Sequence, residues 1–185
     1  DTDGHGFNTA VGSASQLNAT TGEFNTSLGA FSMGSGVTAG DRNTVVGYNS
    51  GAAITSGANN TVLGADAMQE LTTGANNVAI GKGALRQADT GESQNVAIGV
   101  NALEDMDSPE DNHNVAVGYR AASNLTTGAN NTAVGNEAMG VGITTGDHHQ
   151  AYGYDAVKAL SSVANNNSVG AFAGDSITTG DNNTA

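Results

Sequence analysis

Hydrophobic and polar residues alternate along this chain in short blocks that recur every 17 to 19 residues. Each block runs from Asn through Thr or Val, a small residue and a large apolar residue to Gly, as in "NNTAVG" at residues 130–135. Short stretches rich in β-branched residues, with small and large side chains in alternation, predict strands. We call the closing Gly the marker Gly, and it occurs at Gly12, Gly29, Gly47, Gly64, Gly81, Gly99, Gly118, Gly135, Gly153 and Gly170.

The segment after each marker Gly has its own pattern. Ser or Ala stands three residues after the Gly in every unit, and a Thr-Gly corner follows in most units. Gly followed by Asn or Asp predicts a turn, because these residues tolerate positive φ. Each unit therefore reads as a strand, a tight turn, a second short extended segment and a Thr-Gly corner. Runs of helix formers such as "KGALRQA" leave a short helical turn in that second segment as the alternative to an extended or irregular one.

Asn occupies the position four residues before the marker Gly in every unit but one. No unit can bury an apolar face alone, so we expect the units to stack as coils about 4.8 Å apart. In such a stack each Asn amide can bond to the next coil, which favours a buried file of Asn side chains. Positions that vary between units are expected to face solvent. The predicted Asn file comprises Asn8, Asn25, Asn43, Asn60, Asn77, Asn95, Asn114, Asn131 and Asn166.

The repeat predicts an all-β fold, a parallel β-solenoid or β-roll of about ten stacked coils that forms one domain over residues 1–185. The net charge of −13 argues against nucleic acid and anionic membrane surfaces as partners. No apolar run approaches the length of a transmembrane segment. The chain starts at Asp1 and stops within an eleventh unit, so we interpret it as an excerpt of a longer fibrous protein. No cofactor is expected.

The stretch "NNVAIGKGA" at residues 76–84 resembles the head repeats of trimeric autotransporter adhesins, and the whole unit resembles repeats of phage-type tail-fibre proteins. The resemblance implies a left-handed parallel β-roll, three chains associated in parallel, and a location on a cell or virion surface. It also implies binding of a host-surface glycan or protein. These units are longer than those of adhesin heads, so a three-sided solenoid closed within a single chain is the alternative.

His148 and His149 replace the usual Asn pair in the ninth unit, with Tyr154 nearby. One interpretation is a metal or glycan contact built from imidazole and aromatic groups. The other is a tolerated substitution within the Asn file. Around the threefold axis of a trimer His149 would occur three times, and we hypothesise that such a ring binds an ion.

Two further features are candidates for ligand contact, although no metal site is assigned. Tyr48, Tyr119 and Tyr154 each follow a marker Gly directly, and aromatic rings in a line can stack on sugars. The alternative is packing against a neighbouring coil or chain. The acidic segment Glu104–Asp111 offers the oxygen ligands that Ca²⁺ prefers, with a solvated or receptor-reading loop as the alternative.

Catalysis is not expected, because charged residues are scattered and no nucleophile motif occurs. The sequence instead predicts an extracellular, cell-surface or virion-surface module that acts as spacer and adhesive surface through multivalent contacts. Ice binding by a Thr-rich solenoid is an alternative, weakened because the Thr pairs stand at corners beside Gly. A purely structural extracellular filament is the other alternative.

Overall fold

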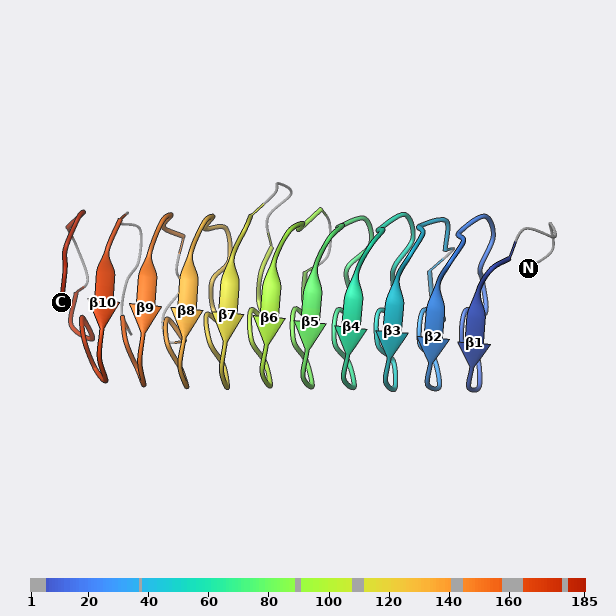
Figure 1. Ribbon diagram of the computed structural model, residues 1–185, viewed down its shortest axis with the longest axis horizontal. Coiled ribbons are helices and arrows are strands. Elements are labelled where there is room, and N and C mark those ends of the chain that lie inside the picture. The colour runs from blue at the N-terminus through green and yellow to red at the C-terminus, as the bar shows by residue number, and fades with distance from the viewer. Residues whose placement is uncertain are drawn as a thin grey trace.

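Ten short parallel strands form one sheet in the computed structural model, which describes residues 6–36, 38–88, 91–107, 112–140, 145–157, 165–177 and 180–185. Each strand pairs with the next strand along the chain, and Figure 1 shows them side by side in one row. This arrangement confirms the predicted all-β parallel solenoid. The strands are β1 (Thr9–Val11), β2 (Thr26–Leu28), β3 (Thr44–Val46), β4 (Thr61–Leu63), β5 (Val78–Ile80), β6 (Val96–Ile98), β7 (Val115–Val117), β8 (Thr132–Val134), β9 (Gln150–Tyr152) and β10 (Asn167–Val169).

The register of the sheet superposes equivalent residues of successive units. Val62 of β4 pairs with Ala79 of β5, and both are the middle residues of their strands. The same register holds between β6 and β7, where Val96 pairs with Val115 across a unit of 19 residues. Additional residues are therefore accommodated in the connections, and the sequence repeat becomes a repeat in space.

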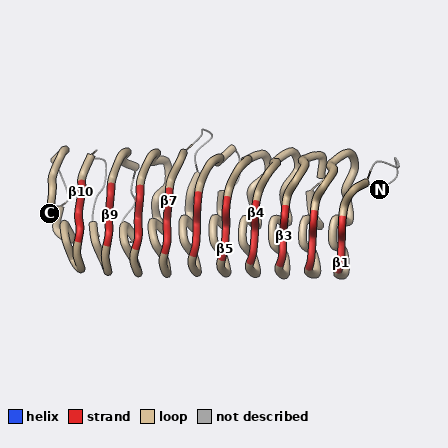
Figure 2. The backbone as a smooth tube through the Cα atoms, in the orientation of Figure 1, coloured by secondary structure: helices blue, strands red, loops and turns tan. Residues whose placement is uncertain are grey.

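The segment behind each strand consists of turns, so it is irregular and not extended. Figure 2 shows a strand on one side of each coil and loop on the remainder, and no helix occurs among the described residues. Leu85 and Leu103 lie in this segment with φ of 53° and 50°, a left-handed conformation that Leu rarely adopts. Their N–H groups donate to the carbonyls of Ala102 and Ala121 in the next coil, each at 3.0 Å. These hydrogen bonds hold the backbone in its unusual conformation.

The core is narrow because small side chains face each other across each coil. Ala79, the middle residue of β5, and Ala84, three residues after the marker Gly, are both fully buried. In an earlier coil Ser27 and Ser32 occupy the same two positions, and their hydroxyl oxygens are hydrogen-bonded at 2.8 Å. The small residues that recur in these two columns are therefore explained by close approach of the two walls.

Larger buried side chains lie four residues after the marker Gly. They belong to positions that vary between units, so the expectation that variable positions face solvent was wrong for this column. Several apolar types fill a similar interior volume, which lets the residue change without exposing it. The fully buried members are Met33, Met68, Leu85 and Leu103, with Met139 and Val157 at 1% exposure.

The marker Gly is fixed by conformation and by space. Gly64 has a φ of 145°, a conformation that side chains of L-residues rarely adopt. A Cβ atom at Gly64 would overlap the backbone carbonyl oxygen of Gly81, the equivalent residue in the next coil. Any larger residue would therefore separate two coils and strain the backbone.

The described residues form one continuous stack, in which every strand belongs to the same sheet. None of their segments forms a helix with the length and apolar character that crossing a membrane would require. Left-handed winding and association into a trimer stay predictions.

Candidate functional site

The Asn file joins each coil to the next through both ends of the amide. The side-chain oxygen Oδ1 of Asn60 accepts the backbone N–H of Asn77 at 2.9 Å, and Nδ2 of Asn60 donates to the Gly74 carbonyl at 2.9 Å. Nδ2 of Asn77 also donates to Oδ1 of Asn60 at 3.2 Å. The same oxygen-to-backbone contact links the first seven successive pairs of the file, from Asn8 to Asn131. These side chains therefore satisfy backbone groups that would otherwise be buried without partners.

Asn95 departs from this pattern on its donor side. Its Nδ2 donates to the carbonyl of Ser93 in its own coil at 3.1 Å. Its Oδ1 still accepts the backbone N–H of Asn114 at 2.9 Å. At Asn95 the contact to the next coil is therefore made by the side-chain oxygen, which accepts a backbone N–H as in the rest of the file.

His149 takes the place of Asn in the file and is fully buried. The backbone N–H of His149 donates to Oδ1 of Asn131 at 2.8 Å. The imidazole nitrogen Nδ1 of His149 accepts the backbone N–H of Asn166 at 3.3 Å. Burial inside its own chain makes the predicted ligand contact at His149 wrong, and with it the ring of three His149 side chains around a trimer axis. The imidazole nitrogen instead reproduces the acceptor role of the Asn oxygen.

His148 is exposed, with a φ of 60°, and its N–H donates to the carbonyl of Ala129 at 3.0 Å. The two adjacent histidines therefore face different environments, solvent and core. They cannot bind one ion together within a single chain. His148 remains available as a surface contact.

The three tyrosines lie on the surface, but the structure does not bring them together. Tyr48, Tyr119 and Tyr154 are 58%, 48% and 49% exposed and follow β3, β7 and β9. Tyr48 and Tyr154 form edge-to-face contacts with phenylalanines of adjacent coils, with ring centroids 6.0 and 5.2 Å apart. Intervening coils separate the tyrosines, so they provide three local contacts instead of one aromatic row.

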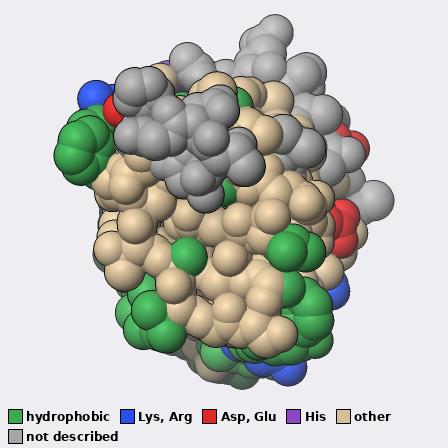
Figure 3. All heavy atoms as spheres, turned by 90° about the vertical axis from the view of Figure 1, so that its right-hand side faces the viewer, with side chains coloured by type: hydrophobic (Ala, Val, Ile, Leu, Met, Phe, Trp, Pro, Cys, Tyr) green, Lys and Arg blue, Asp and Glu red, His purple; other side chains and the backbone are tan. Residues whose placement is uncertain are grey.

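The outer sheet face, defined as the first and third residues of β1–β10, is the feature that sequence reasoning missed. The third residue is large and apolar in every strand, and six of these ten are at least 36% exposed, among them Leu63 and Ile98. No strand contains a charged residue, although the chain carries 23 of them. The end view in Figure 3 shows hydrophobic side chains around the rim of the stack. Exposed apolar residues gathered on one face in this way are typical of interaction sites.

The signal for this face was present in the sequence. Within a strand, side chains alternate between the two faces, so a buried middle residue forces its neighbours outward. If the small middle residue of each strand is taken to face the core, the large apolar third residue must lie on the outer face of the sheet.

The acidic segment Glu104–Asp111 lies partly outside the described residues, which exclude 108–111. Glu104 forms an ion pair with Arg86, and burial together with the Glu104 charge raises the pKa of Asp105. Within the described part of the chain, no group of three or more His, Asp or Glu residues could hold a metal ion.

No protein-family model, curated protein or solved structure matches this chain.

Proposed function

We propose that this chain is a segment of a homotrimeric surface fibre that serves as a rigid spacer and adhesive module, without catalysis. The outer sheet face is the contact between the three chains in this proposal. Its support is the absence of any charged residue from all ten strands of a protein with a net charge of −13. Charge is instead carried by the turns and connections.

The dimensions of the outer sheet face suit association along the whole stack. Ten parallel strands with about 4.8 Å between neighbours span about 43 Å. Three copies arranged around an axis parallel to the stack bring equal coils to the same height, so each apolar column meets its own equivalent. Burial of the exposed Leu, Ile and Val side chains would then drive association.

The adhesive role rests on repetition and on the resemblance of the repeats to adhesin heads and tail fibres. Three chains present each surface feature three times, which raises avidity when single contacts are weak. We place the protein outside the cell, on a cell or virion surface, for the same reason. The partner in this proposal is a host-surface glycan or protein.

Sedimentation equilibrium tests the proposal directly. We expect a particle of three times the 18.3 kDa chain mass, independent of concentration in the micromolar range. A monomer would overturn the fibre. Binding of the trimer to whole cells or a glycan array tests the adhesive part, and a trimer without a partner would be a spacer only.

Ice binding is the second candidate function. It is favoured by threonines on the strands themselves, in addition to those at the corners. Thr is the first residue of β1–β4 and of β8, and Thr9, Thr26, Thr44 and Thr61 are exposed in register on one face of the sheet. Ordered hydroxyl and methyl groups at regular spacing can match an ice surface. A monomer that depresses the freezing point below the melting point would favour this function over the fibre.

A further inference from the structure

The turn after β5 differs from the equivalent turns of the other coils. Lys82 and Gly83 follow the marker Gly, and Arg86 stands five residues after it, so a single turn supplies two of the five basic residues of the chain. The other described turns have Ala, Phe, Asp, Asn, Arg or Glu where Gly83 stands, with φ near the 66° of Gly83. The backbone conformation therefore does not require Gly at this position.

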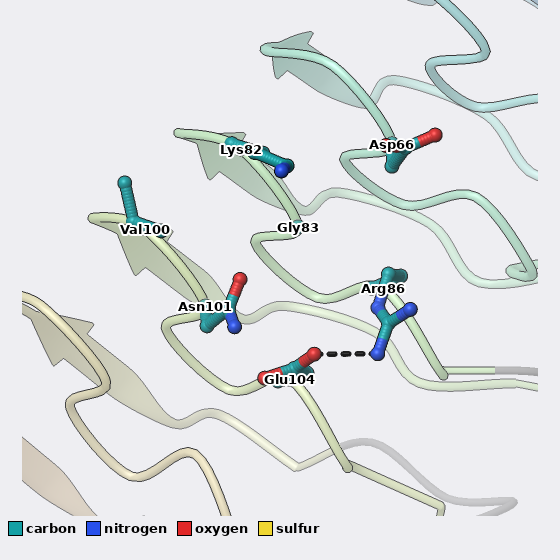
Figure 4. Close-up of a pocket in the computed structure, with 7 residues that line it drawn as sticks. All are labelled: Asp66, Lys82, Gly83, Arg86, Val100, Asn101 and Glu104. Carbon is teal, nitrogen blue, oxygen red and sulfur yellow. Dashed lines mark hydrogen bonds and ion pairs between the residues drawn. The ribbon is translucent and has the colours of Figure 1, made fainter.

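A hollow of about 310 Å³ lies at this turn, lined by Asp66, Lys82, Gly83, Arg86, Val100, Asn101 and Glu104. Figure 4 shows Gly83 at its centre, with the polar side chains of three successive coils around it. A Cβ atom at Gly83 would meet Oδ1 of Asn101 at 2.6 Å, so the place of a side chain at this position is taken by the Asn101 amide, which lines the hollow. The volume lies at the lower end of the range for small-ligand sites.

Two acidic and two basic residues line the hollow, but only one acid and one base form an ion pair. Arg86 and Glu104 form an ion pair, and Asp66 accepts a hydrogen bond from Asn49 at 3.1 Å. Within the described part of the chain, the ammonium group of Lys82 has neither an ion pair nor a hydrogen bond, and the residue is exposed. One cation is thus free to bind a ligand, among polar groups that can bond to hydroxyls.

We propose that this hollow binds a carboxylated sugar unit, with its single negative charge on Lys82 and its hydroxyls bonded to Asp66, Asn101 and the Arg86–Glu104 pair. A carboxylate matches the one unpaired cation, whereas a doubly charged phosphate would meet the two carboxylates of the rim. This inference rests on the proposed adhesive function and names its ligand class.

The test compares two probes that differ only in the carboxylate, methyl glucuronide and methyl glucoside, titrated into the full chain and followed by NMR. We expect the glucuronide to bind at least tenfold more tightly. Lys82→Gln should remove that preference, and Lys82→Arg should retain part of it. Gly83→Asp, which places at the centre of the hollow the residue type that the preceding coil already carries, should weaken both probes.

Arg42→Gln is the matched control, because it removes the same charge at an exposed position, where Arg42 lies over the Phe24 ring. Equal binding of the two probes, or equal effects of Lys82→Gln and Arg42→Gln, would overturn the site. Sedimentation of the same samples separates the two proposals. A trimer without glucuronide preference would refute only the proposed sugar site. A monomer with that preference would refute only the proposed trimer.

Discussion

The backbone N–H of Asn77 donates to Oδ1 of Asn60 at 2.9 Å, and these two residues occupy the same position in successive coils. The amide of Asn60 also donates to the carbonyl of Gly74, three residues before Asn77. One side chain therefore binds two backbone groups on the next coil, and repetition of that contact sets the coils in register. A carboxylate could accept but not donate here, and a hydroxyl is too short to make both bonds.

Asn95→Leu should destabilise the protein more than Gln94→Leu. Asn95 is fully buried and its Oδ1 accepts the N–H of Asn114, so Leu leaves that donor buried without an acceptor, at a cost of about 1–3 kcal/mol. Gln94 is exposed, and we expect its replacement to change the free energy of unfolding by about 0.5 kcal/mol or less. Thermal unfolding followed by circular dichroism measures the difference. Equal melting temperatures would contradict the role of the file.

Gly81→Ala and Gly83→Ala form a matched pair within one turn. A Cβ atom at Gly81, where φ is 131°, would overlap the backbone carbonyl of Gly99, which cannot move without separating the coils. At Gly83 the obstacle is the end of the flexible Asn101 side chain, and φ is 66°. We expect a loss of about 3 kcal/mol or more for the first and about 1 kcal/mol for the second. Similar losses in urea unfolding would refute a special role for the marker Gly.

The stacking could be predicted from the sequence because it acts through equivalent residues. Asn and Gly recur at fixed intervals only if each contacts its own equivalent, as Gly64 and Gly81 do. The conformation behind the strand could not be predicted, because Leu85 and Leu103 adopt left-handed φ values against their intrinsic preference. Hydrogen bonds to the next coil decide their conformation, and these bonds exist only after stacking.

The candidate site was predicted less well for a related reason. Sequence alone marked His149 as exceptional but gave no indication that its Nδ1 accepts the Asn166 N–H within the core. Charged residues likewise appeared scattered along the sequence, with nothing to indicate that Lys82 and Arg86 belong to one site. Only the superposition of three coils brings them around Gly83 with Asp66 and Glu104.

Asp105→Asn should give a small gain in stability at neutral pH. Burial and the Glu104 carboxylate raise the pKa of Asp105, while Arg86 and Arg120 oppose the rise. A carboxyl group with a higher pKa in the folded chain is protonated more readily when folded, so its charge destabilises the fold above that pKa. Stability should therefore increase as the pH falls through the raised pKa toward the ordinary value of about 4.

The amide that replaces the Asp105 carboxylate in this variant keeps an oxygen that can accept the hydrogen bond from Nε2 of Gln87, which is 2.7 Å long in the native protein. We expect the melting temperature to rise by up to about 2 °C at pH 7 and this part of the pH dependence to disappear. Asp107→Asn, at an exposed position nearby, is the control. A larger effect at Asp107 would argue against the burial of Asp105 as the cause.

His149→Asn should be at least as stable as the native protein, and His149→Leu less stable by about 1–3 kcal/mol. Asn restores the residue found elsewhere in the file and keeps an acceptor for the Asn166 N–H, whereas Leu removes it. Urea unfolding of the two variants gives the comparison. Leu and Asn variants of equal stability would contradict the acceptor role, and so would a zinc-dependent rise in melting temperature that only the native protein shows.

Ile98→Lys should dissociate the proposed trimer without unfolding the chain. Ile98 is the third residue of β6, is 36% exposed and lies between Ile80 and Val117 on the outer sheet face. A Lys ammonium in the middle of an apolar contact would be buried three times without a partner, at a cost of several kcal/mol. In the separated chain the same side chain would remain in water and cost little.

Sedimentation velocity at micromolar concentration should therefore show monomers for Ile98→Lys, with a far-ultraviolet circular dichroism spectrum like that of the native protein. Gln94→Lys is the matched control, because it adds the same charge at an exposed position outside the outer sheet face. It should remain a trimer. If Ile98→Lys sediments like Gln94→Lys, the chains associate through another surface or not at all.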